Sequence, residues 1–459
     1  HTLLDELGTM FDKDKTKESV IEYHYLSHSK NYAVEQTDSG MKFYDSNGIL
    51  ENNELKDDSQ EKFKESDFKR LINEKIQKTI YGEKYSNIVC LVGAGASVTP
   101  DLNLNYGKTV KMIADDIFEK LNESDDFYTL QELSEKCKYR KGDILSKEET
   151  GTTDQIKLDG SFNLEDFLST LLHYRPYVPD NEKEKLNKTI EKILLLIKEN
   201  TNYSYNENDL KHGEFLNTLS RLSGKDGNKF SVITTNYDVL IEQAAAKHNF
   251  VVFDGFNFTA EPTFESDMFE WNLVKEVQNI NTREVEFKKK TFNLVKIHGS
   301  LTWEKNGDKI YRKDKDSITD TNKMVMVFPS SDKFAQSYQE PYFELFTKFQ
   351  DLMKRPNTLL ISVGFSFADV HISKMITQAL KNNTSLKLLV TDFNISPNRV
   401  WDNVSKQYIE INNGNSNFNQ NWEVLIKLMN QGYSISFLKT TMNSDLDDYL
   451  SGRYLNDDN

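Results

Sequence analysis

An apolar run at residues 87–92 ends abruptly in a glycine-rich turn, Gly93-Ala94-Gly95-Ala96-Ser97. A helix is expected soon afterwards, because apolar residues between 110 and 121 recur at the helical spacing i, i+3, i+4, i+7. A buried strand, a tight turn and a helix in this order are typical of a sheet built from parallel strands. This unit therefore constrains the fold more than any other feature of the chain.

Apolar runs and amphipathic helices continue to alternate along the chain. Further buried strands are expected at residues 229–233, 250–253, 293–297, 324–328, 358–363, 386–390 and 434–438. Residues 164–172 and 186–197 show helical spacing instead, and a polar loop is expected at 142–160. We therefore predict an α/β fold, with a doubly wound, mostly parallel Rossmann-like sheet in residues 83–455 and a helical cap inserted at about 122–215.

The first 82 residues have a different pattern. Short strand-like runs lie at 20–26, 32–36 and 41–44, and a charged helix is expected at about 61–78. We predict an N-terminal α+β extension, residues 1–82, whose candidate role is assembly or partner docking.

Charge and composition exclude several classes of protein. The 459 residues contain 57 Lys and Arg against 72 Asp and Glu, a net charge of −15, which disfavours direct nucleic-acid binding. No apolar run is long enough to span a membrane, so a cytoplasmic protein is expected. Cys90 and Cys137 are too few for a disulfide framework or a zinc site of four thiolates, and we predict no metal site.

Polar motifs follow several of the predicted strands. Gly93 and Gly95 would let the backbone approach a phosphate, although a tight turn without a ligand is the alternative. The segment 234–238, Thr-Thr-Asn-Tyr-Asp, follows the strand at 229–233, and Gly364-Phe365-Ser366 follows the strand at 358–363. Because the carboxyl ends of parallel strands share one edge of a sheet, these motifs are expected to converge on one crevice.

Three polar residues of these motifs have two interpretations each. Asp238 or Asn236 can cap the helix that follows, but Asn236 stands with two threonines at a strand tip, where ligands collect. His298 directly follows a strand and precedes Gly299, and it can be a satisfied core residue or a general base.

Four motifs resemble the sirtuin family in their order along the chain and in their separations. They are Gly93-Ala94-Gly95-Ala96-Ser97, Thr235-Asn236-Tyr237-Asp238, His298-Gly299 and Gly364-Phe365-Ser366. The detail is more similar to the bacterial defence branch of that family, in which NAD is destroyed during phage infection. The residues that carry this closer resemblance are 163–168, Pro329, 364–371 and 445–450. The resemblance covers about residues 84–452, and 255–292 and 303–322 look like insertions.

The resemblance implies an NAD site with a role for each matching residue. The diphosphate would be faced by Gly93, Ala94, Gly95 and Ser97, the nicotinamide ribose by Thr235 and Asn236, the adenosine ribose by Gly364 and Ser366, and the adenine by Asn394. His298 would be the catalytic histidine, and Asn236 would orient the ribose or a water molecule.

Two departures from the sirtuin pattern shape the functional prediction. Sirtuin deacylases carry a zinc ribbon held by two Cys pairs, which two cysteines cannot build, and Leu102-Asn103 stands where deacylases have Phe-Arg. We therefore predict an NAD+ glycohydrolase, a hydrolase that uses NAD as its substrate without zinc and releases nicotinamide and ADP-ribose. The alternatives are an NAD-dependent protein deacylase and a catalytically silent nucleotide-sensing or assembly subunit.

Unregulated NAD destruction would kill the host, so the enzyme is expected to be restrained until a partner or trigger activates it. Related proteins of the family act beside a HerA-type ATPase or helicase, beside a short Argonaute, or with a fused sensor. Because few residues follow position 452, a separate partner is expected, together with a homo-oligomeric state and a role in antiviral defence by abortive infection.

Overall fold

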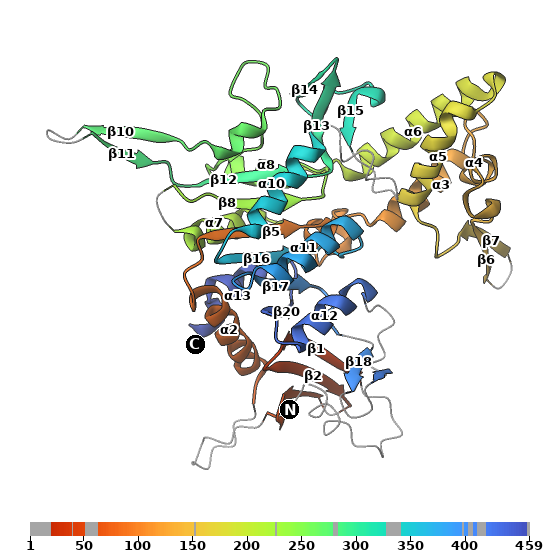
Figure 1. The fold of residues 1–459 in the computed structure, drawn as a ribbon. Coiled ribbons are helices and arrows are strands. Elements are labelled where there is room, and N and C mark those ends of the chain that lie inside the picture. Colours follow the sequence, from red (N-terminus) through yellow and green to blue (C-terminus); the bar gives the residue numbers. More distant parts are fainter. Residues whose placement is uncertain are drawn as a thin grey trace, which may run out of the picture.

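The computed structural model describes residues 20–38, 40–50, 63–150, 153–224, 227–278, 283–326, 341–396, 399–402, 407–410 and 419–456. Its largest element is an eleven-stranded sheet with the strand order β4-β3-β2-β1-β20-β17-β16-β5-β8-β12-β9 (Figure 1). The strands are β1 (Val20–Ser27), β2 (Asn31–Thr37), β3 (Gly40–Asp45), β4 (Gly48–Ile49), β5 (Asn87–Val92), β8 (Phe230–Thr234), β9 (Val251–Phe253), β12 (Thr291–Lys296), β16 (Thr358–Val363), β17 (Lys387–Asp392) and β20 (Ile435–Lys439).

The part of the sheet from β20 to β9 is parallel throughout. The chain fills it from β5 outward to β8 and β12, and then returns to add β16, β17 and β20 on the other side of β5. The predicted doubly wound, mostly parallel α/β fold is therefore confirmed. Adjacent strands β5 and β16 form the point at which the winding direction changes, where α/β proteins commonly bind ligands.

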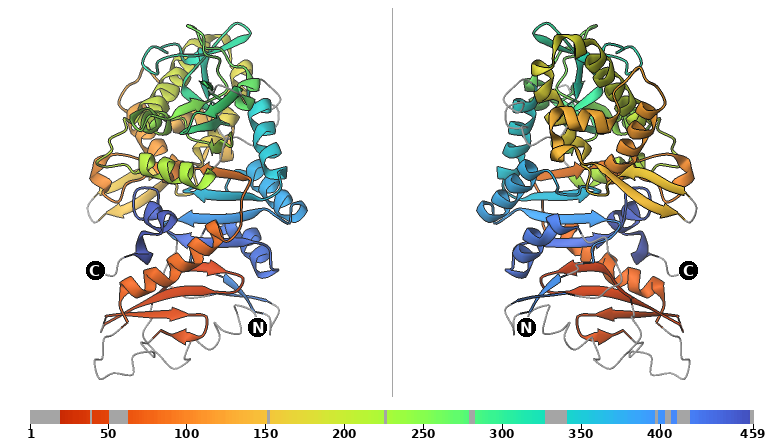
Figure 2. Two further views of the ribbon diagram at one scale, coloured as in Figure 1. Left: turned by 90° about the vertical axis from the view of Figure 1, so that its left-hand side faces the viewer. Right: turned by 90° about the vertical axis from the view of Figure 1, so that its right-hand side faces the viewer.

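Helices cover both faces of this sheet, as the two side views in Figure 2 show. One face is covered by α2 (Glu65–Tyr81), α7 (His212–Ser223), α8 (Leu240–Lys247) and α13 (Leu446–Ser451), and the other by α10 (Tyr342–Lys354), α11 (Val370–Asn382) and α12 (Glu423–Asn430). In β5, Cys90 and Val92 belong to the core under α2, α7, α8 and α13, while Val89 and Leu91 belong to the core under α10, α11 and α12. This burial on both faces explains why the strands read as continuous apolar runs.

The helical cap lies at one side of the molecule with an apolar core of its own (Figure 1). It contains α3 (Val110–Asn122), α4 (Leu130–Cys137), β6 (Leu145–Thr150), β7 (Thr153–Leu158), α5 (Leu164–Tyr174) and α6 (Lys183–Thr201). The loop predicted at 142–160 is wrong, because β6 and β7 form an antiparallel hairpin there. Its polar composition hid the strands, although Leu158 is buried in the core of the cap.

The N-terminal extension continues the central sheet. Strands β1 to β4 form an antiparallel meander, and β1 pairs antiparallel with β20 through Tyr25 and Leu438. Helix α2 is fastened to α13, because the side-chain amides of Asn73 and Gln77 both donate to the carbonyl of Tyr449. The boundary at residue 82 and the docking role of the extension stay predictions.

A second correction concerns the strand predicted at 324–328. Residues Met324–Met326 form β15, which belongs to a separate three-stranded sheet with β13 (Gly299–Asn306) and β14 (Lys309–Arg312). The chain reverses after His298, so β13 leaves the central sheet and pairs antiparallel with β15. An apolar run cannot reveal which sheet it joins. Residues 327–328 and Pro329 lie outside the described residues.

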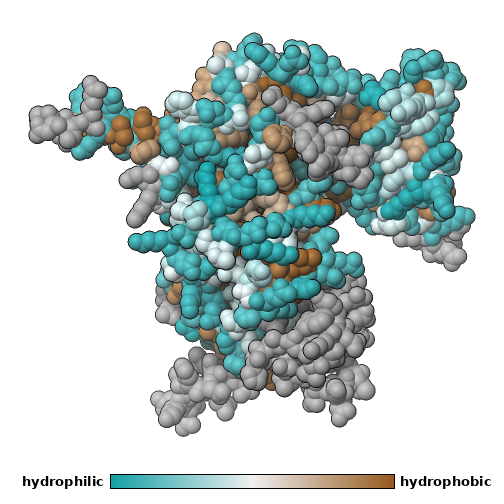
Figure 3. Space-filling view, viewed as in Figure 1, coloured by the Kyte–Doolittle hydropathy of each residue, from teal (hydrophilic) through white to brown (hydrophobic). Residues whose placement is uncertain are grey.

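Two further hairpins were not predicted. Strands β18 (Arg399–Asp402) and β19 (Gln407–Glu410) form one, and β10 (Val274–Gln278) and β11 (Arg283–Phe287) form the other. The β10–β11 hairpin projects from the body and carries exposed apolar side chains on a largely hydrophilic face (Figure 3). No helix within the described ranges is long and apolar enough to cross a membrane.

Candidate functional site

The carboxyl ends of five parallel strands meet at one edge of the central sheet. In the strand register, Val92 of β5 lies beside Thr234 of β8 and Val363 of β16. Thr234 in turn lies beside Lys296 of β12, and Val363 lies beside Thr391 of β17. The motifs that follow these residues therefore begin side by side at the carboxyl edge of the sheet, as the sequence indicates.

The glycine-rich turn after β5 packs directly on the turn after β16. The N–H of Gly93 donates to the carbonyl of Val363 at 3.0 Å, and the N–H of Gly95 donates to the carbonyl of Gly364 at 2.9 Å. A Cβ atom at Gly93 would lie 2.5 Å from the Gly364 carbonyl oxygen. A Cβ atom at Gly364, whose φ is +58°, would lie 2.4 Å from the backbone nitrogen of Ala96. These glycines are therefore required by the contact of two backbones, whatever ligand binds there.

The turn itself, η1 (Ala94–Ser97), offers few free groups. Ala94 is exposed, whereas Ser97 is buried and its hydroxyl donates to Oδ2 of Asp238 at 2.9 Å. Because the Gly95 N–H is engaged with Gly364, this N–H points into the protein. The predicted diphosphate contacts of Gly93, Ala94, Gly95 and Ser97 stay predictions.

Asn236 ties the tip of β8 to the tip of β5. Its Nδ2 donates to the carbonyl of Gly93 at 2.9 Å, and its backbone N–H donates to Oγ1 of Thr234 at 3.0 Å. The Thr234 hydroxyl then donates to the carbonyl of Val92 at 2.9 Å. The neighbouring residues Thr235 and Asn236 are both partly exposed.

Asp238 serves the start of helix α8. Its Oδ1 accepts a hydrogen bond from the N–H of Leu240 at 3.2 Å, which supports the capping interpretation of this residue. Burial raises the pKa of the Asp238 carboxyl, and Lys296 partly opposes that rise.

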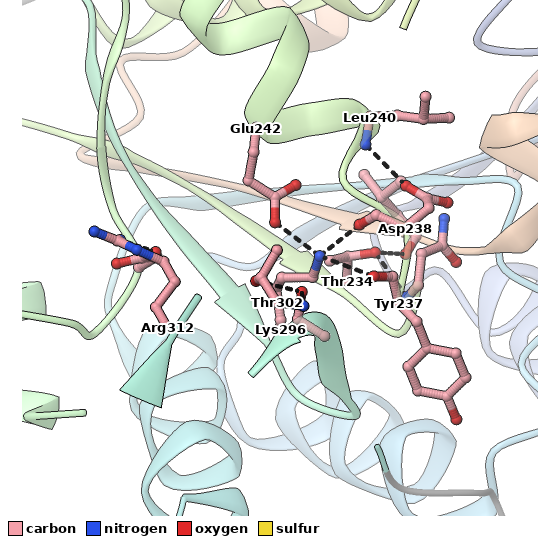
Figure 4. A network of polar contacts seen from close by, with 12 residues as sticks. Thr234, Tyr237, Asp238, Leu240, Glu242, Lys296, Thr302 and Arg312 are labelled. Carbon is pink, nitrogen blue, oxygen red and sulfur yellow. Dashed lines mark hydrogen bonds and ion pairs between the residues drawn. The ribbon is translucent and has the colours of Figure 1, made fainter. Parts of the chain in front are cut away.

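Lys296 is a buried cation that sequence reasoning missed (Figure 4). Its Nζ donates to the backbone carbonyls of Tyr237 and Asp238 and lies 2.8 Å from Oε1 of Glu242. The lysine side chain is 1% exposed and stands two residues before His298. Because its Nζ binds the carbonyls of Tyr237 and Asp238, it clamps the loop that carries Asn236. The signal was present in the sequence, because a lysine directly follows the apolar residues Leu294 and Val295 at the end of this strand.

His298 follows β12, and the next residue reverses the chain. Gly299 has a φ of +88°, and a Cβ atom there would lie 2.0 Å from the Val325 carbonyl oxygen. Nε2 of His298 lies 3.2 Å from Oδ2 of Asp369, and both side chains are about nine-tenths buried. The structure therefore joins His298 to the loop between β16 and α11.

Ser366 and Asn394 contact other neighbours. Ser366 is exposed, its Oγ accepts from the N–H of Ala368 at 3.3 Å, and its carbonyl accepts from Asn419 at 2.7 Å. Asn394 is buried, and its Oδ1 accepts from the N–H of Ser396 at 3.0 Å. The contacts with ribose and adenine remain predictions for both residues.

At the tip of β17 itself stands Asp392, which sequence reasoning also missed. Burial raises the pKa of its carboxyl to about 6, and Oδ1 accepts from the N–H of Phe393 at 2.6 Å. Its position is visible in the sequence, because an acidic residue ends a strand that contains the apolar run Leu388-Leu389-Val390.

The described residues contain no group of three or more His, Cys, Asp or Glu side chains that could hold a metal ion. Cys90 is buried within β5, and Cys137 is the last residue of α4. The absence of zinc stays a prediction. A groove of about 970 Å³ lies between α10, α11 and α12, and its lining includes Phe367 and His371 but none of the predicted site residues.

Comparison with known proteins places this edge of the sheet in a family context. Residues 231–428, which are less than half of the chain, match a family model described as the SIR2-like domain. The match includes the motifs at Asn236, His298 and Gly364 and supports a sirtuin-like chain, while the Gly93 turn lies before it.

A solved structure, described as "Structural Basis for the Mechanism and Regulation of Sir2 Enzymes", aligns with a TM-score of 0.31 and 11% identity. That alignment covers 78% of this chain and 95% of the other chain. A comparison with curated proteins finds no match.

Proposed function

We propose that this protein is an NAD+ glycohydrolase that cleaves the bond between nicotinamide and ribose. The observation that carries the proposal is the placement of Asn236 and His298 at neighbouring strand tips, within the region that matches the SIR2-like domain. Enzymes of the sirtuin family use NAD, and the crevice beside β5 and β16 is where a nucleotide binds in doubly wound sheets.

Cleavage needs a held ribose, a water molecule and a group that takes a proton. The C1′–nitrogen bond breaks with its electron pair on nicotinamide, which leaves as a neutral molecule, while positive charge develops on the ribose. Because Nδ2 of Asn236 is bound to Gly93, its Oδ1 is the group that can accept a hydrogen bond from a ribose hydroxyl or a water. His298 takes the proton from the attacking water. Positioning of this kind accelerates hydrolysis without covalent help.

Hydrolysis is preferred over deacylation because of the cysteines and the cap. The sequence has two cysteines, so the four-thiolate zinc ribbon of sirtuin deacylases cannot form. A cap of helices with its own core stands beside the sheet instead. The substrate is therefore expected to be NAD and water, without an acyl-lysine peptide.

The biological setting is part of the same proposal. An enzyme that depletes NAD in the cytoplasm suits antiviral defence by abortive infection, provided that it is held inactive until infection. We expect a homo-oligomer and an activating partner such as a HerA-type ATPase or a short Argonaute, with any nucleic acid bound by that partner. The net charge of −15 is consistent with this division of tasks.

The test measures nicotinamide and ADP-ribose from NAD, with and without the product of the neighbouring gene. Wild type should release both products in equal amounts, and His298→Ala and Asn236→Ala should each lose about 10²- to 10⁴-fold in rate. His173→Ala, a histidine replacement within the cap helix α5, is the matched control and should keep the rate. Wild-type activity no higher than that of both site variants under activating conditions would refute the proposal.

A further inference from the structure

Asp369 uses its two carboxylate oxygens for two different contacts. Oδ1 accepts hydrogen bonds from the backbone N–H groups of His371 at 3.0 Å and Ile372 at 3.2 Å, and so caps helix α11. Oδ2 lies 3.2 Å from Nε2 of His298, on a strand tip 71 residues earlier in the chain. The side chain of Asp369 is 8% exposed and that of His298 is 10% exposed, so little water reaches this contact.

Capping alone does not require a carboxylate. Asn and Ser cap helices about as well as Asp, and neither carries a charge. A carboxylate that is nine-tenths buried costs free energy unless it is paired or hydrogen-bonded. Oδ1 makes the two cap contacts, and Oδ2 contacts the imidazole of His298.

We infer that Asp369 is a positioning residue for His298 in the proposed NAD cleavage, and the inference rests on that function. A neutral imidazole has one donor nitrogen and one acceptor nitrogen, whereas an ionised carboxylate only accepts. Asp369 therefore selects the tautomer with the proton on Nε2, which leaves the lone pair on Nδ1. A carboxylate in this position also stabilises the imidazolium that forms during proton transfer.

The proton balance of the step is complete with water as the co-reactant. An O–H bond of water breaks and its proton goes to Nδ1 of His298, while the oxygen forms a bond to C1′ of the ribose. The C1′–nitrogen bond breaks, and its electron pair neutralises the positive charge of the nicotinamide ring. His298 then holds the proton as an imidazolium beside the Asp369 carboxylate and later returns it to solvent.

Two variants separate positioning from capping. Asp369→Asn and Asp369→Ser both keep an oxygen that can cap α11, so their unfolding midpoints should stay close to that of wild type. In Asp369→Asn an amide N–H₂ faces Nε2 and favours the other tautomer; in Asp369→Ser the shorter side chain cannot reach the ring. Both should lower kcat for nicotinamide release at least tenfold, with KM within about twofold.

The control variant removes the N-cap side chain of a different helix. Thr129 caps α4 in the helical cap, where its Oγ1 accepts from the N–H of Glu132 at 3.1 Å. Thr129→Ala should lower the unfolding midpoint without changing kcat. If Asp369→Asn keeps kcat within twofold of wild type, the inference is overturned.

A spectroscopic readout makes the inference independent of turnover. In protein labelled with ¹⁵N-histidine, and with His298→Gln to assign the signal, the Nε2 and Nδ1 shifts report the tautomer of His298. We expect the proton on Nε2 in wild type and a shift toward Nδ1 in Asp369→Asn. If wild type releases no nicotinamide even with its partner while the tautomer still responds, the proposed function fails and the positioning role stands. An unchanged tautomer would overturn the positioning role.

Discussion

The strand-tip edge has two halves that are built by opposite means. At β5 and β16, two backbone turns meet directly because Gly93 and Gly364 carry no side chains. At β8 and β12, side chains fill the space, and the buried Lys296 holds the carbonyls of Tyr237 and Asp238. The first half depends on the absence of side chains at two glycines, and the second depends on the buried charge of Lys296.

This difference decides how each half responds to change. A close contact between two backbones leaves no space for a side chain, because any added atom would force the main chain to shift. A buried cation with three oxygen partners can be replaced by a side chain of similar shape, but its partners then lose their hydrogen bonds. The first half should therefore fail by strain and the second by lost polar contacts.

The largest effect is expected from Gly364→Ala. The new Cβ would lie 2.4 Å from the Ala96 nitrogen at a φ of +58°, so strain and overlap add. We expect the free energy of unfolding to fall by about 3 kcal/mol or more in denaturant titration. Gly307→Ala isolates the strain, because Gly307 has a φ of +62° and open space around its Cβ position, and it should lose about 1 kcal/mol. Equal losses in the two variants would contradict the close-contact account.

Lys296→Met should have the next largest effect. The substitution keeps most of the side-chain volume but leaves Glu242 and two carbonyls without their donor, so we expect a loss of about 2–4 kcal/mol by denaturant titration. NAD turnover should fall as well, because the clamped loop carries Asn236. Lys275→Met breaks an exposed ion pair with Glu286 on the projecting hairpin and should change stability by less than about 0.5 kcal/mol. A Lys296 variant as stable as the Lys275 variant would remove the clamp from the account.

Asp392→Asn tests the carboxylate beside the glycine half. Burial raises the pKa of Asp392 to about 6, so the folded state holds this proton more tightly than the unfolded state. The penalty for ionising it therefore grows as the pH rises from about 4 to about 6 and is fully present above that range. Thermal unfolding should show Asp392→Asn more stable than wild type by about 1–2 kcal/mol near pH 8, with little gain near pH 4. The exposed control Asp125→Asn should show no such pH-dependent gain, and an equal gain at both pH values for Asp392→Asn would contradict the assignment.

The smallest effect is expected from Ser366→Ala. The side chain is exposed and makes one backbone contact, so stability should change by less than about 0.5 kcal/mol. If its hydroxyl binds the adenosine ribose, steady-state kinetics should show KM for NAD raised about 3- to 10-fold with kcat unchanged. Ser161→Ala, in the cap, serves as the control, and an unaltered KM in Ser366→Ala would exclude that ribose contact.

The sequence predicted the central sheet well, for a physical reason. Strands buried on both faces must be apolar throughout, and residues 87–92, 358–363 and 434–438 correspond to β5, β16 and β20. The hairpin β6–β7 was missed because its polar strands pair locally in the cap. Strand β15 was assigned to the wrong sheet because a short apolar run does not encode its partner.

The site was predictable as a set of strand tips but not as a network. Glycines and a histidine after apolar runs are visible in the sequence, and register places them together. The contact between His298 and Asp369 joins segments 71 residues apart, and the clamp of Lys296 binds mainly backbone carbonyls. Neither Asp369 nor these carbonyls have a sequence signature as contact partners. Any residue supplies a carbonyl, and an Asp before a helix is already explained as a helix cap.

Hydrogen exchange of the slow His298→Ala variant, with and without NAD, tests most directly whether the strand tips form one nucleotide site. The account predicts that NAD protects the segments that begin at Gly93, Thr235 and Gly364 together, while the β10–β11 hairpin exchanges unchanged. Protection confined to the groove between α10, α11 and α12, or to none of the strand tips, would contradict it.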